Sequence, residues 1–409
     1  YITEYCENQY KDWKFVKEMW KKIQQLINEV KEKNSGRKGD IIIHLIDSAR
    51  AMDVYERSAD GKVKLSLFKE YEKNAVIFSE AYSTGPSTYE SMIGTIKQKY
   101  SYDENVYENN NFMFDIDEFA FLKRIKKQNM PIRFYNSKDY YIMNKSDDIY
   151  MKEQLHMPEK LWSAACDMAV TDGPVFNFLY YPWELHFPML CGYMRRKPQI
   201  KMFADVGLED MSDFIEDQLQ DCLKYVDCQF AYYKDFFSED AMTVIMADHS
   251  QPIYDKKRND PFFMFYNDKD RVAHVTFIII SNELKAGVNS RLFSMLDFNK
   301  VMEQAYFEKC IDIPEREIIE YQFYNVQNRR LRELAMKRGL MDYTEGIRCF
   351  VSKKYLYAKT ATGKQEVYDL KDIYSDISST DEGKNFIKYV EENYDTGFPD
   401  FWTVRNTVS

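Results

Sequence analysis

The chain has 409 residues, of which 45% are hydrophobic and 16% aromatic; this composition can bury a large core and excludes bulk disorder. Its 56 basic and 66 acidic residues give a formal charge of −10, which argues against a general nucleic-acid-binding protein. Seven cysteines without a CxxC pair indicate reduced thiols rather than a disulfide framework. The longest apolar runs, such as Phe277 to Ile280, are too short to cross a bilayer.

The cellular compartment stays open on this evidence. Free cysteines and the lack of a signal peptide favour the cytoplasm. The chain opens with Tyr1 rather than Met, however, which leaves room for a fragment of a longer, membrane-anchored protein that works outside the cytoplasm.

The first predicted element is an amphipathic helix over residues 11–33, a stretch without Gly or Pro that ends at Asn34-Ser35-Gly36. Apolar residues recur there at helical spacing: Trp13, Val16, Trp20, Ile23, Ile27 and Val30. We assign residues 1–36 to an N-terminal helical extension. We expect its apolar face to pack on the domain that follows rather than on a membrane or a partner.

From residue 40, short apolar runs alternate with longer helical stretches, one of which covers residues 210–236. The runs are Ile41 to Ile46, Ala75 to Phe78, Val175 to Tyr181, Thr243 to Ala247 and Val275 to Ile280. Runs without polar alternation are typical of strands buried on both faces. The pattern predicts an α/β fold over residues 37–310, with a doubly wound, mostly parallel sheet flanked by helices.

The remaining residues, 311–409, predict a small C-terminal α+β subdomain. A charged helix near 326–338 precedes alternating residues 347–358, and a turn at 361–364 leads into a further strand. A helix near 383–393 closes the chain.

Polar residues follow two of the predicted strands at the end where a parallel sheet collects its ligands. Asp47 follows the run from Ile41, and a carboxylate there suits a hard cation, although such an Asp is often only a helix N-cap. Asp248 and His249 follow the run from Thr243. An oxygen donor beside a nitrogen donor suits zinc or manganese, while a loop Asp beside a surface His is the alternative.

A third segment places a hydroxyl group at the start of a helix. Gly85-Pro86 forms a turn, and Ser87 or Thr88 opens the helix that follows. Backbone N–H groups and the helix dipole favour an anion at this place, which suits an alkoxide that attacks a phosphate or sulfate ester. An ordinary Ser/Thr N-cap explains the same pattern, so the weight lies in the combination of the three segments.

In this order the three segments resemble sulfatase-like proteins of the alkaline phosphatase superfamily and their phosphoethanolamine- and phosphoglycerol-transferase relatives. Asp47-Ser-Ala-Arg50 is similar to the family's D-S-x-R. The segment from Ala81 to Ser91 resembles A-Y-S-T-S-P-x-T-x-x-S, and Ala247-Asp-His-Ser resembles S-D-H-G. The spacing from Ala81 places the family's nucleophile on Thr88 rather than on its neighbour.

Weaker matches extend the resemblance over roughly residues 40–375. They are Pro131 to Lys138 with Y-R-T-A-x-x-G-K, Phe176 to Pro188 with F-x-D-P-H-x-P, Ala273 to Ile279 with R-V-P-L-I-I, and Gly346 to Leu370 with R-x-x-K-Y and L-Y-D-L. Eight matches in the family's order make coincidence a poor explanation.

Some positions depart from the family. Sulfatases that use formylglycine carry C-x-P-x-R, whereas this chain has Thr88 as nucleophile and Met92 in place of the arginine, which excludes that chemistry. Ser48 stands where sulfatases have a second acid, and Ser250 replaces the glycine of S-D-H-G. With five histidines and none after His274, a complete second metal site is not expected.

Residues and resemblance together imply one divalent metal ion, with zinc or manganese favoured and calcium or magnesium as alternatives. The predicted metal ligands are Asp47, Thr88, Asp248 and His249. Thr88 and His186 are the predicted catalytic residues; His186 would protonate the leaving group or bind the ester, unless it is structural. Arg50 and Lys138 would bind the anionic oxygens, although Arg50 can instead brace Asp47 and Lys138 can be a plain surface residue.

The leading functional hypothesis is a phospho-transferase or phosphodiesterase-type hydrolase that forms a covalent phospho-threonine. Its substrate would be a phosphate or sulfate ester, with a surface glycan or lipid as one class of acceptor, and neither a nucleic-acid partner nor a transmembrane segment in this chain is expected. The alternatives are a sulfatase-like hydrolase of another ester and a catalytically silent binding domain that keeps the fold.

Overall fold

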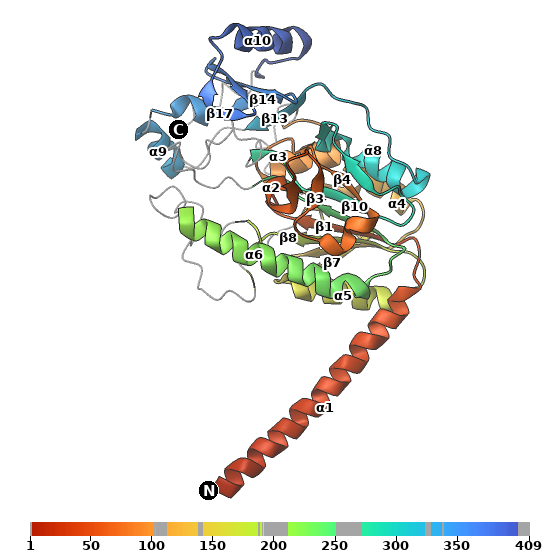
Figure 1. Ribbon diagram of the computed structural model, residues 1–409. Helices are drawn as coiled ribbons and strands as arrows, with labels where there is room; N and C mark the ends of the chain where they lie inside the picture. Colours follow the sequence, from red (N-terminus) through yellow and green to blue (C-terminus); the bar gives the residue numbers. More distant parts are fainter. Residues whose placement is uncertain are drawn as a thin grey trace.

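The computed structural model describes residues 2–101, 103, 113–137, 142–186, 189, 191, 212–250, 272–323, 329–337 and 339–399. A long helix, α1 (Ile2–Ser35), leads into an eight-stranded sheet, and a five-stranded antiparallel sheet follows it along the chain (Figure 1). The predicted α/β fold with a small C-terminal α+β subdomain is therefore confirmed.

The central sheet has the strand order β11-β4-β10-β9-β1-β8-β6-β7. Its strands are β1 (Ile41–Ile46), β4 (Ala75–Phe78), β6 (Ile132–Asn136), β7 (Ile149–Glu153), β8 (Phe176–Tyr181), β9 (Met242–Met246), β10 (Phe277–Ile280) and β11 (Gly287–Asn289). Strand β10 runs antiparallel to β9 and β4, while the other pairings are parallel. The sheet is mostly parallel, as its apolar runs predict.

Helices cover both faces of this sheet. Figure 1 shows α5 (Met157–Ala169) and α6 (Ser212–Tyr233) on one side, and α4 (Ala120–Lys126) and α8 (Phe298–Glu303) on the other. Every residue of β1 and β8 is buried between these layers. The two strands therefore lie at the centre of the domain, covered by helices on both faces.

Shorter elements connect the layers. They are α2 (Ala51–Val54), β2 (Tyr55–Arg57), β3 (Val63–Leu65), β5 (Ala81–Tyr82), α3 (Thr88–Met92), a π-helical turn (Ile93–Lys97) and β12 (Phe293–Ser294).

The C-terminal subdomain is a meander whose strands follow chain order. Its elements are β13 (Ile319–Phe323), α9 (Arg329–Lys337), β14 (Ile347–Val351), β15 (Tyr355–Thr360), β16 (Gln365–Asp369), β17 (Asp372–Asp376) and α10 (Asp381–Asn393). Gly363 takes the positive φ of 95° that the predicted turn between β15 and β16 needs. Phe386 and Val390 of α10 pack with Phe350 and Tyr357 in a small second core.

Helix α1 packs on the domain only at its C-terminal end. There Val30 and Asn34 are buried, and the Asn34 side-chain amide donates to the carbonyl oxygens of Ala165 at 2.9 Å and Phe236 at 3.0 Å. Toward the N-terminus of the helix, Trp13 and Trp20 are 64% and 60% exposed. Figure 1 shows this part of the helix projecting away from the sheet. The prediction that the apolar face packs on the domain is wrong for most of α1, because a helix of 34 residues is about 50 Å long and extends past the surface it meets.

The described residues form long helices such as α1 and α6. None of those helices combines the length and the apolar character that a bilayer crossing requires.

His44 is a buried titratable group in the middle of β1. Its Nδ1 lies 2.9 Å from the Tyr181 hydroxyl, and burial lowers the pKa of His44 from 6.5 to about 3. Because the unfolded chain protonates this imidazole near pH 6.5, it binds more protons than the folded chain between about pH 6.5 and 3. The free energy of unfolding is therefore expected to fall as the pH drops through this window.

We predict that His44→Leu makes this decline shallower. The wild-type imidazole lowers the free energy of unfolding by up to about 1.4 kcal/mol for each pH unit of acidification. The leucine variant lacks this contribution. Urea unfolding between pH 6.5 and 4.5 measures the slope. Tyr181→Phe removes the same hydrogen bond but keeps the imidazole, so it should retain the wild-type slope; equal slopes for His44→Leu and wild type would contradict the prediction.

Candidate functional site

The candidate site lies at the carboxyl ends of three neighbouring parallel strands in the middle of the central sheet. Asp47 follows β1, Asp248 and His249 follow β9, and His186 lies five residues beyond the end of β8. Thr88 comes from a separate segment, the first residue of α3. Since β1 pairs in parallel with both β8 and β9, their carboxyl ends meet at the same edge.

The Asp47 carboxylate is the centre of the polar contacts. Its Oδ2 accepts hydrogen bonds from the Tyr180 hydroxyl at 2.7 Å and from Thr88 Oγ1 at 3.4 Å. Its Oδ1 accepts from Ser48 Oγ at 3.0 Å and lies 3.4 Å from His249 Nε2. Asp47 therefore joins the predicted nucleophile to the predicted metal ligands, as the sequence pattern requires.

Asp248 places a second carboxylate in the same buried space. Its Oδ1 accepts from the backbone N–H groups of Ser48 at 3.2 Å and His249 at 2.9 Å. Its Oδ2 is buried without a hydrogen-bond donor among the described residues and lies 3.6 Å from His249 Nε2. A buried carboxylate oxygen without a donor is costly, and a cation would satisfy it.

The electrostatics of the site also favour a cation. Burial, and then the neighbouring Asp47 carboxylate, raise the pKa of Asp248. Burial alone would lower the pKa of His249, but the Asp248 and Asp47 carboxylates outweigh it, so the pKa of His249 is raised. The shift of His249, and the smaller contribution of Asp47 to that of Asp248, reflect two carboxylates close together, whose charge a divalent ion would offset.

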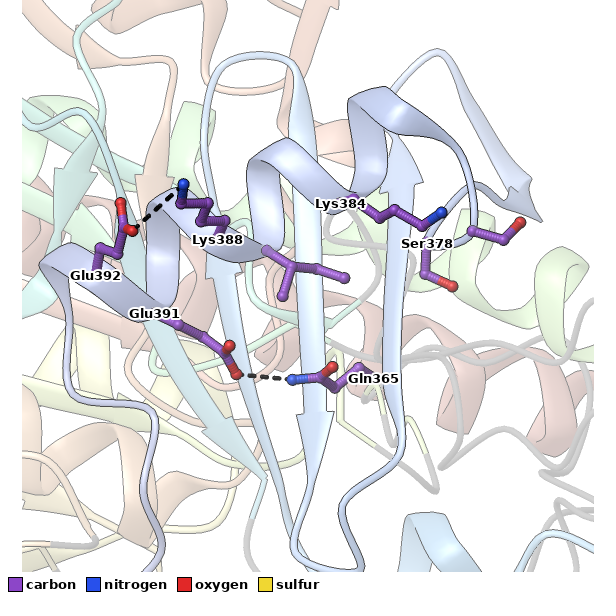
Figure 2. A pocket seen from close by; sticks show the side chains of 8 residues that line it. Gln365, Ser378, Lys384, Lys388, Glu391 and Glu392 are labelled. Carbon is purple, nitrogen blue, oxygen red and sulfur yellow. Dashed lines mark hydrogen bonds and ion pairs between the residues drawn. The ribbon is translucent and has the colours of Figure 1, made fainter.

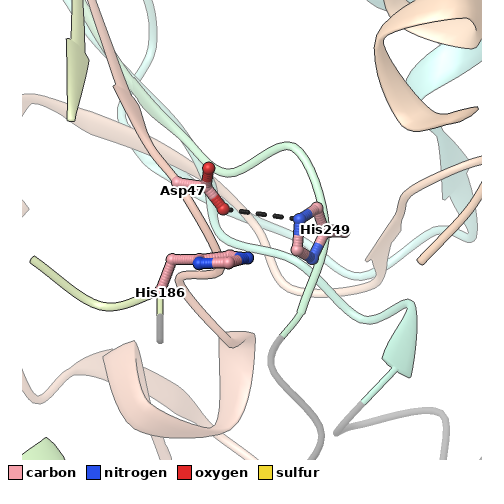
Figure 3. A group of neighbouring side chains, drawn as sticks. All are labelled: Asp47, His186 and His249. Carbon is pink, nitrogen blue, oxygen red and sulfur yellow. Dashed lines mark ion pairs between the residues drawn. The ribbon is translucent and has the colours of Figure 1, made fainter. Parts of the chain in front are cut away.

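His186 belongs to this group more closely than the sequence indicated. Asp47, His186 and His249 each offer a ligand atom within 4.8 Å of the others, and Figure 3 shows the three side chains converging. The ring centroids of the two histidines are 5.9 Å apart. Carboxylate oxygens, imidazole nitrogens and the Thr88 hydroxyl form a mixed N/O donor set that fits one divalent ion of the zinc or manganese type. Sequence analysis considered His186 only as a catalytic or substrate-binding residue.

In the segment predicted to carry the nucleophile, Thr88 and not Ser87 faces Asp47. Ser87 precedes the first turn of α3, and its Oγ donates to Glu90 Oε2 at 3.1 Å. Thr88 is half-buried, with its hydroxyl facing Asp47. Gly94 is required below it, because a Cβ at this position would overlap the side chain of Thr84. Thr84 in turn donates its hydroxyl to the carbonyl oxygens of Glu90 and Ser91, so this close approach holds the helix that Thr88 begins.

Ser48 has a structural role that sequence analysis missed. It has a φ of 65°, a left-handed conformation that is uncommon for a residue other than glycine and that recurs at functional sites. This turn lets its hydroxyl donate to Asp47 while its N–H donates to Asp248. In the sequence, Ser48 was noted only as a departure from the paired acids of sulfatases. The other departure, Ser250, donates its hydroxyl to the carbonyl of His274 and so stabilises the turn after β9.

Tyr180 is a further residue that sequence analysis did not select. It lies in β8, fully buried, and burial together with the Asp47 carboxylate raises the pKa of its hydroxyl. It therefore stays protonated and donates to Asp47. The sequence could not single out Tyr180, because it lies in an apolar run beside a second tyrosine. That neighbour, Tyr181, contacts His44 instead.

Of the two predicted anion-binding residues, Arg50 lies within the part of the chain that the structure describes. Arg50 is buried, and its guanidinium Nε donates to Asp53 Oδ2 at 2.6 Å. This bidentate pair joins Arg50 to Asp53 and not to Asp47, so both the anion-binding role and the alternative of bracing Asp47 stay predictions. Lys138 lies outside the described residues.

A separate hollow of about 560 Å³ opens on the C-terminal subdomain, beside α10 and β16 (Figure 2). Its polar lining is largely paired internally: Gln365 Nε2 donates to Glu391 at 2.7 Å, and Lys388 lies 3.8 Å from Glu392. The residues that line it include no histidine and no hydroxyl–carboxylate pair comparable to Thr88 and Asp47. We therefore take the group at the carboxyl ends of β1, β8 and β9 as the candidate functional site.

Solved structures share this architecture. A 2-O GAG sulfatase matches with a TM-score of 0.62 at 14% identity, over 87% of this chain and 91% of that one. The phosphonate monoester hydrolase of Agrobacterium radiobacter matches with a TM-score of 0.56 at 10% identity, over 86% and 94%. The chain has the sulfatase-like fold of the alkaline phosphatase superfamily.

The same sulfatase-like fold occurs in an alkaline phosphatase superfamily protein from Vibrio parahaemolyticus, with a TM-score of 0.52 at 14% identity, over 90% of this chain and 96% of that one. No family model matches the sequence, and no curated protein matches it either. The likeness is thus one of structure rather than of overall sequence.

We predict that the purified protein binds about one equivalent of a divalent metal and that Asp248→Asn weakens binding by about tenfold or more, since it removes the charge of the unpaired buried oxygen. Zinc and manganese titrations followed by thermal shift and by elemental analysis measure this. Asp53→Asn, which alters a buried carboxylate outside the site, is the matched control. Unchanged metal content in Asp248→Asn would contradict the assignment.

We also predict that Tyr180→Phe lowers metal affinity by about tenfold, because Asp47 loses the donor that orients it. Tyr181→Phe removes a buried hydroxyl one residue away that contacts His44 instead, so it should leave affinity unchanged. Isothermal titration of the metal-free variants compares the two. Equal effects from both substitutions would show that general destabilisation, and not the orientation of Asp47, is responsible.

Proposed function

We propose that the chain is a metal-dependent enzyme that cleaves or transfers phosphate or sulfate esters, with Thr88 as the nucleophile. The observation that carries this proposal is the position of the Thr88 hydroxyl, 3.4 Å from Asp47 Oδ2 within a group of buried acids and imidazoles. A half-buried hydroxyl beside such a group is accessible to substrate and is placed for activation.

A divalent ion bound by these residues would lower the pKa of the Thr88 hydroxyl and offset the charge of the ester oxygens. Asp47, Asp248 and His249 are the residues proposed to hold it. The Thr88 hydroxyl would lose its proton to water and its Oγ1 would attack phosphorus; the bond to the alcohol oxygen breaks, and the departing alcohol takes a proton from His186. This step leaves a phospho-threonine at position 88.

Resolution of the phospho-threonine decides between hydrolysis and transfer. Attack by water regenerates Thr88 and releases phosphate, whereas attack by an acceptor alcohol transfers the phosphoryl group. The residue at the nucleophile position favours phosphoryl chemistry over the formylglycine route to sulfate hydrolysis. Among proteins of the same fold, one is a phosphonate monoester hydrolase and another a 2-O GAG sulfatase, so a surface glycan or lipid is a reasonable class of substrate.

Two alternatives have specific support. A sulfatase-like hydrolase of another ester would use the same residues, because a sulfate ester presents a similar tetrahedral anion. A silent binding domain is suggested by the departures at Ser48 and Ser250. The contacts of those two serines weaken this alternative, since each one stabilises the site rather than disrupting it.

We predict that Thr88→Ala lowers turnover of a metal-loaded enzyme by about a thousandfold or more, since no other hydroxyl takes its place. Hydrolysis of bis-p-nitrophenyl phosphate, p-nitrophenyl phosphate and p-nitrophenyl sulfate measures the rate, and mass spectrometry of rapidly quenched wild type locates the phosphoryl group. Ser87→Ala is the matched control and should retain activity within about threefold. Full turnover in Thr88→Ala would refute the nucleophile, and metal binding without turnover of any ester would favour the silent domain.

A further inference from the structure

Helix α1 exposes an apolar face between Trp13 and Leu26. The exposed residues are Trp13, Phe15, Val16, Met19, Trp20, Ile23 and Leu26, with exposed fractions from 40% to 64%. The three aromatic side chains alone expose roughly 300–400 Å². An apolar patch of this size rimmed by charge marks an interaction surface in a protein.

The width of the face indicates what covers it. At 3.6 residues per turn, the apolar residues from Trp13 to Ile27 occupy an arc of about 160°. A coiled coil with a second copy would use a narrower seam through Trp13, Val16, Trp20, Ile23 and Ile27. That seam runs for only about two heptads before Val30 is buried on the domain, whereas stable coiled coils sustain about three to four. A broad face suits a broad apolar surface better than it suits a second helix.

The charge of the opposite face points to an anionic surface. Residues 11–22 contain five lysines and two acids, a net charge of +3 within a chain of net charge −10. Lys14, Lys17, Lys21 and Lys22 are exposed on α1. A helix with lysines on its polar face and Trp, Phe and Leu on the other is typical of segments that lie in the plane of a membrane interface.

We propose that α1 is an interfacial anchor that lies in the plane of an anionic lipid bilayer. Its apolar face would enter the boundary between headgroups and acyl chains, with Trp13 and Trp20 at the depth that tryptophan prefers, and its lysines would contact the lipid headgroups. The far end of the helix is held to the domain by Asn34 and by the ion pair between Lys31 and Asp235 at 3.7 Å. This inference rests on α1 alone and does not depend on the proposed chemistry.

Flotation with lipid vesicles tests the proposal. The full chain should float with vesicles of phosphatidylcholine containing about one quarter phosphatidylglycerol, and bind about tenfold or more weakly to phosphatidylcholine alone. Salt at about 0.5 M should reduce binding to the anionic vesicles several-fold, because the lysine contribution is screened. Failure of the wild-type chain to float with anionic vesicles would overturn the proposal.

Double substitutions distinguish vesicle binding through α1 from vesicle binding through other exposed residues. Trp13→Ser with Trp20→Ser should reduce vesicle binding by about tenfold or more, and Lys14→Glu with Lys21→Glu should remove the preference for anionic lipid. Val170→Ser with Tyr374→Ser is the matched control, because it removes apolar side chains that are 78% and 51% exposed elsewhere, and it should bind as wild type. Circular dichroism and metal binding confirm that each variant is folded.

The remaining outcomes also decide the question. Vesicle binding that survives Trp13→Ser with Trp20→Ser would overturn the assignment to α1. A wild-type dimer in sedimentation velocity that the same double substitution converts to monomer, without vesicle binding, would overturn it in favour of self-association.

Discussion

The candidate site depends on one constraint, the parallel pairing of β1 with β8 and β9. That pairing brings Asp47 and Asp248 to the same buried strand edge, where two carboxylates repel each other and one oxygen of Asp248 has no donor among the described residues. Water cannot disperse this charge, because both side chains are at most 3% exposed. A cation is the simplest physical solution, and the nearby imidazoles and hydroxyl complete a suitable donor set.

The surrounding residues hold this arrangement in one geometry. Ser48 adopts an unfavourable backbone conformation that allows it to donate to both acids, and Tyr180 holds the far oxygen of Asp47. The Thr88 hydroxyl donates to the same carboxylate at 3.4 Å. Ligands fixed in this way can activate a nucleophile without reorganising, which is the main contribution that a scaffold makes to metal-assisted ester cleavage.

The proposed anchor and the proposed chemistry concern opposite parts of the molecule. The site lies at the carboxyl ends of the strands, whereas α1 enters β1 from its amino end and extends away from the sheet (Figure 1). A domain attached through α1 would keep its site clear of the helix that binds lipid. Such an arrangement would suit a substrate that extends from a membrane surface, such as a glycan or a lipid headgroup.

Local patterns identified five strands of the central sheet, the long helices α1 and α6 and the turn at Gly363, because apolar runs, helical spacing and turn residues act through neighbouring residues; they did not identify β6, β7 and β11. They also identified Asp47, Thr88, Asp248 and His249 as candidates, which the structure brings together. Only tertiary structure decided that His186 approaches Asp47, that Tyr180 and not Tyr181 supports it, and that α1 leaves the domain surface. Those facts depend on strand order, side-chain direction and the extent of a surface, which involve residues far apart in the sequence and leave no local pattern.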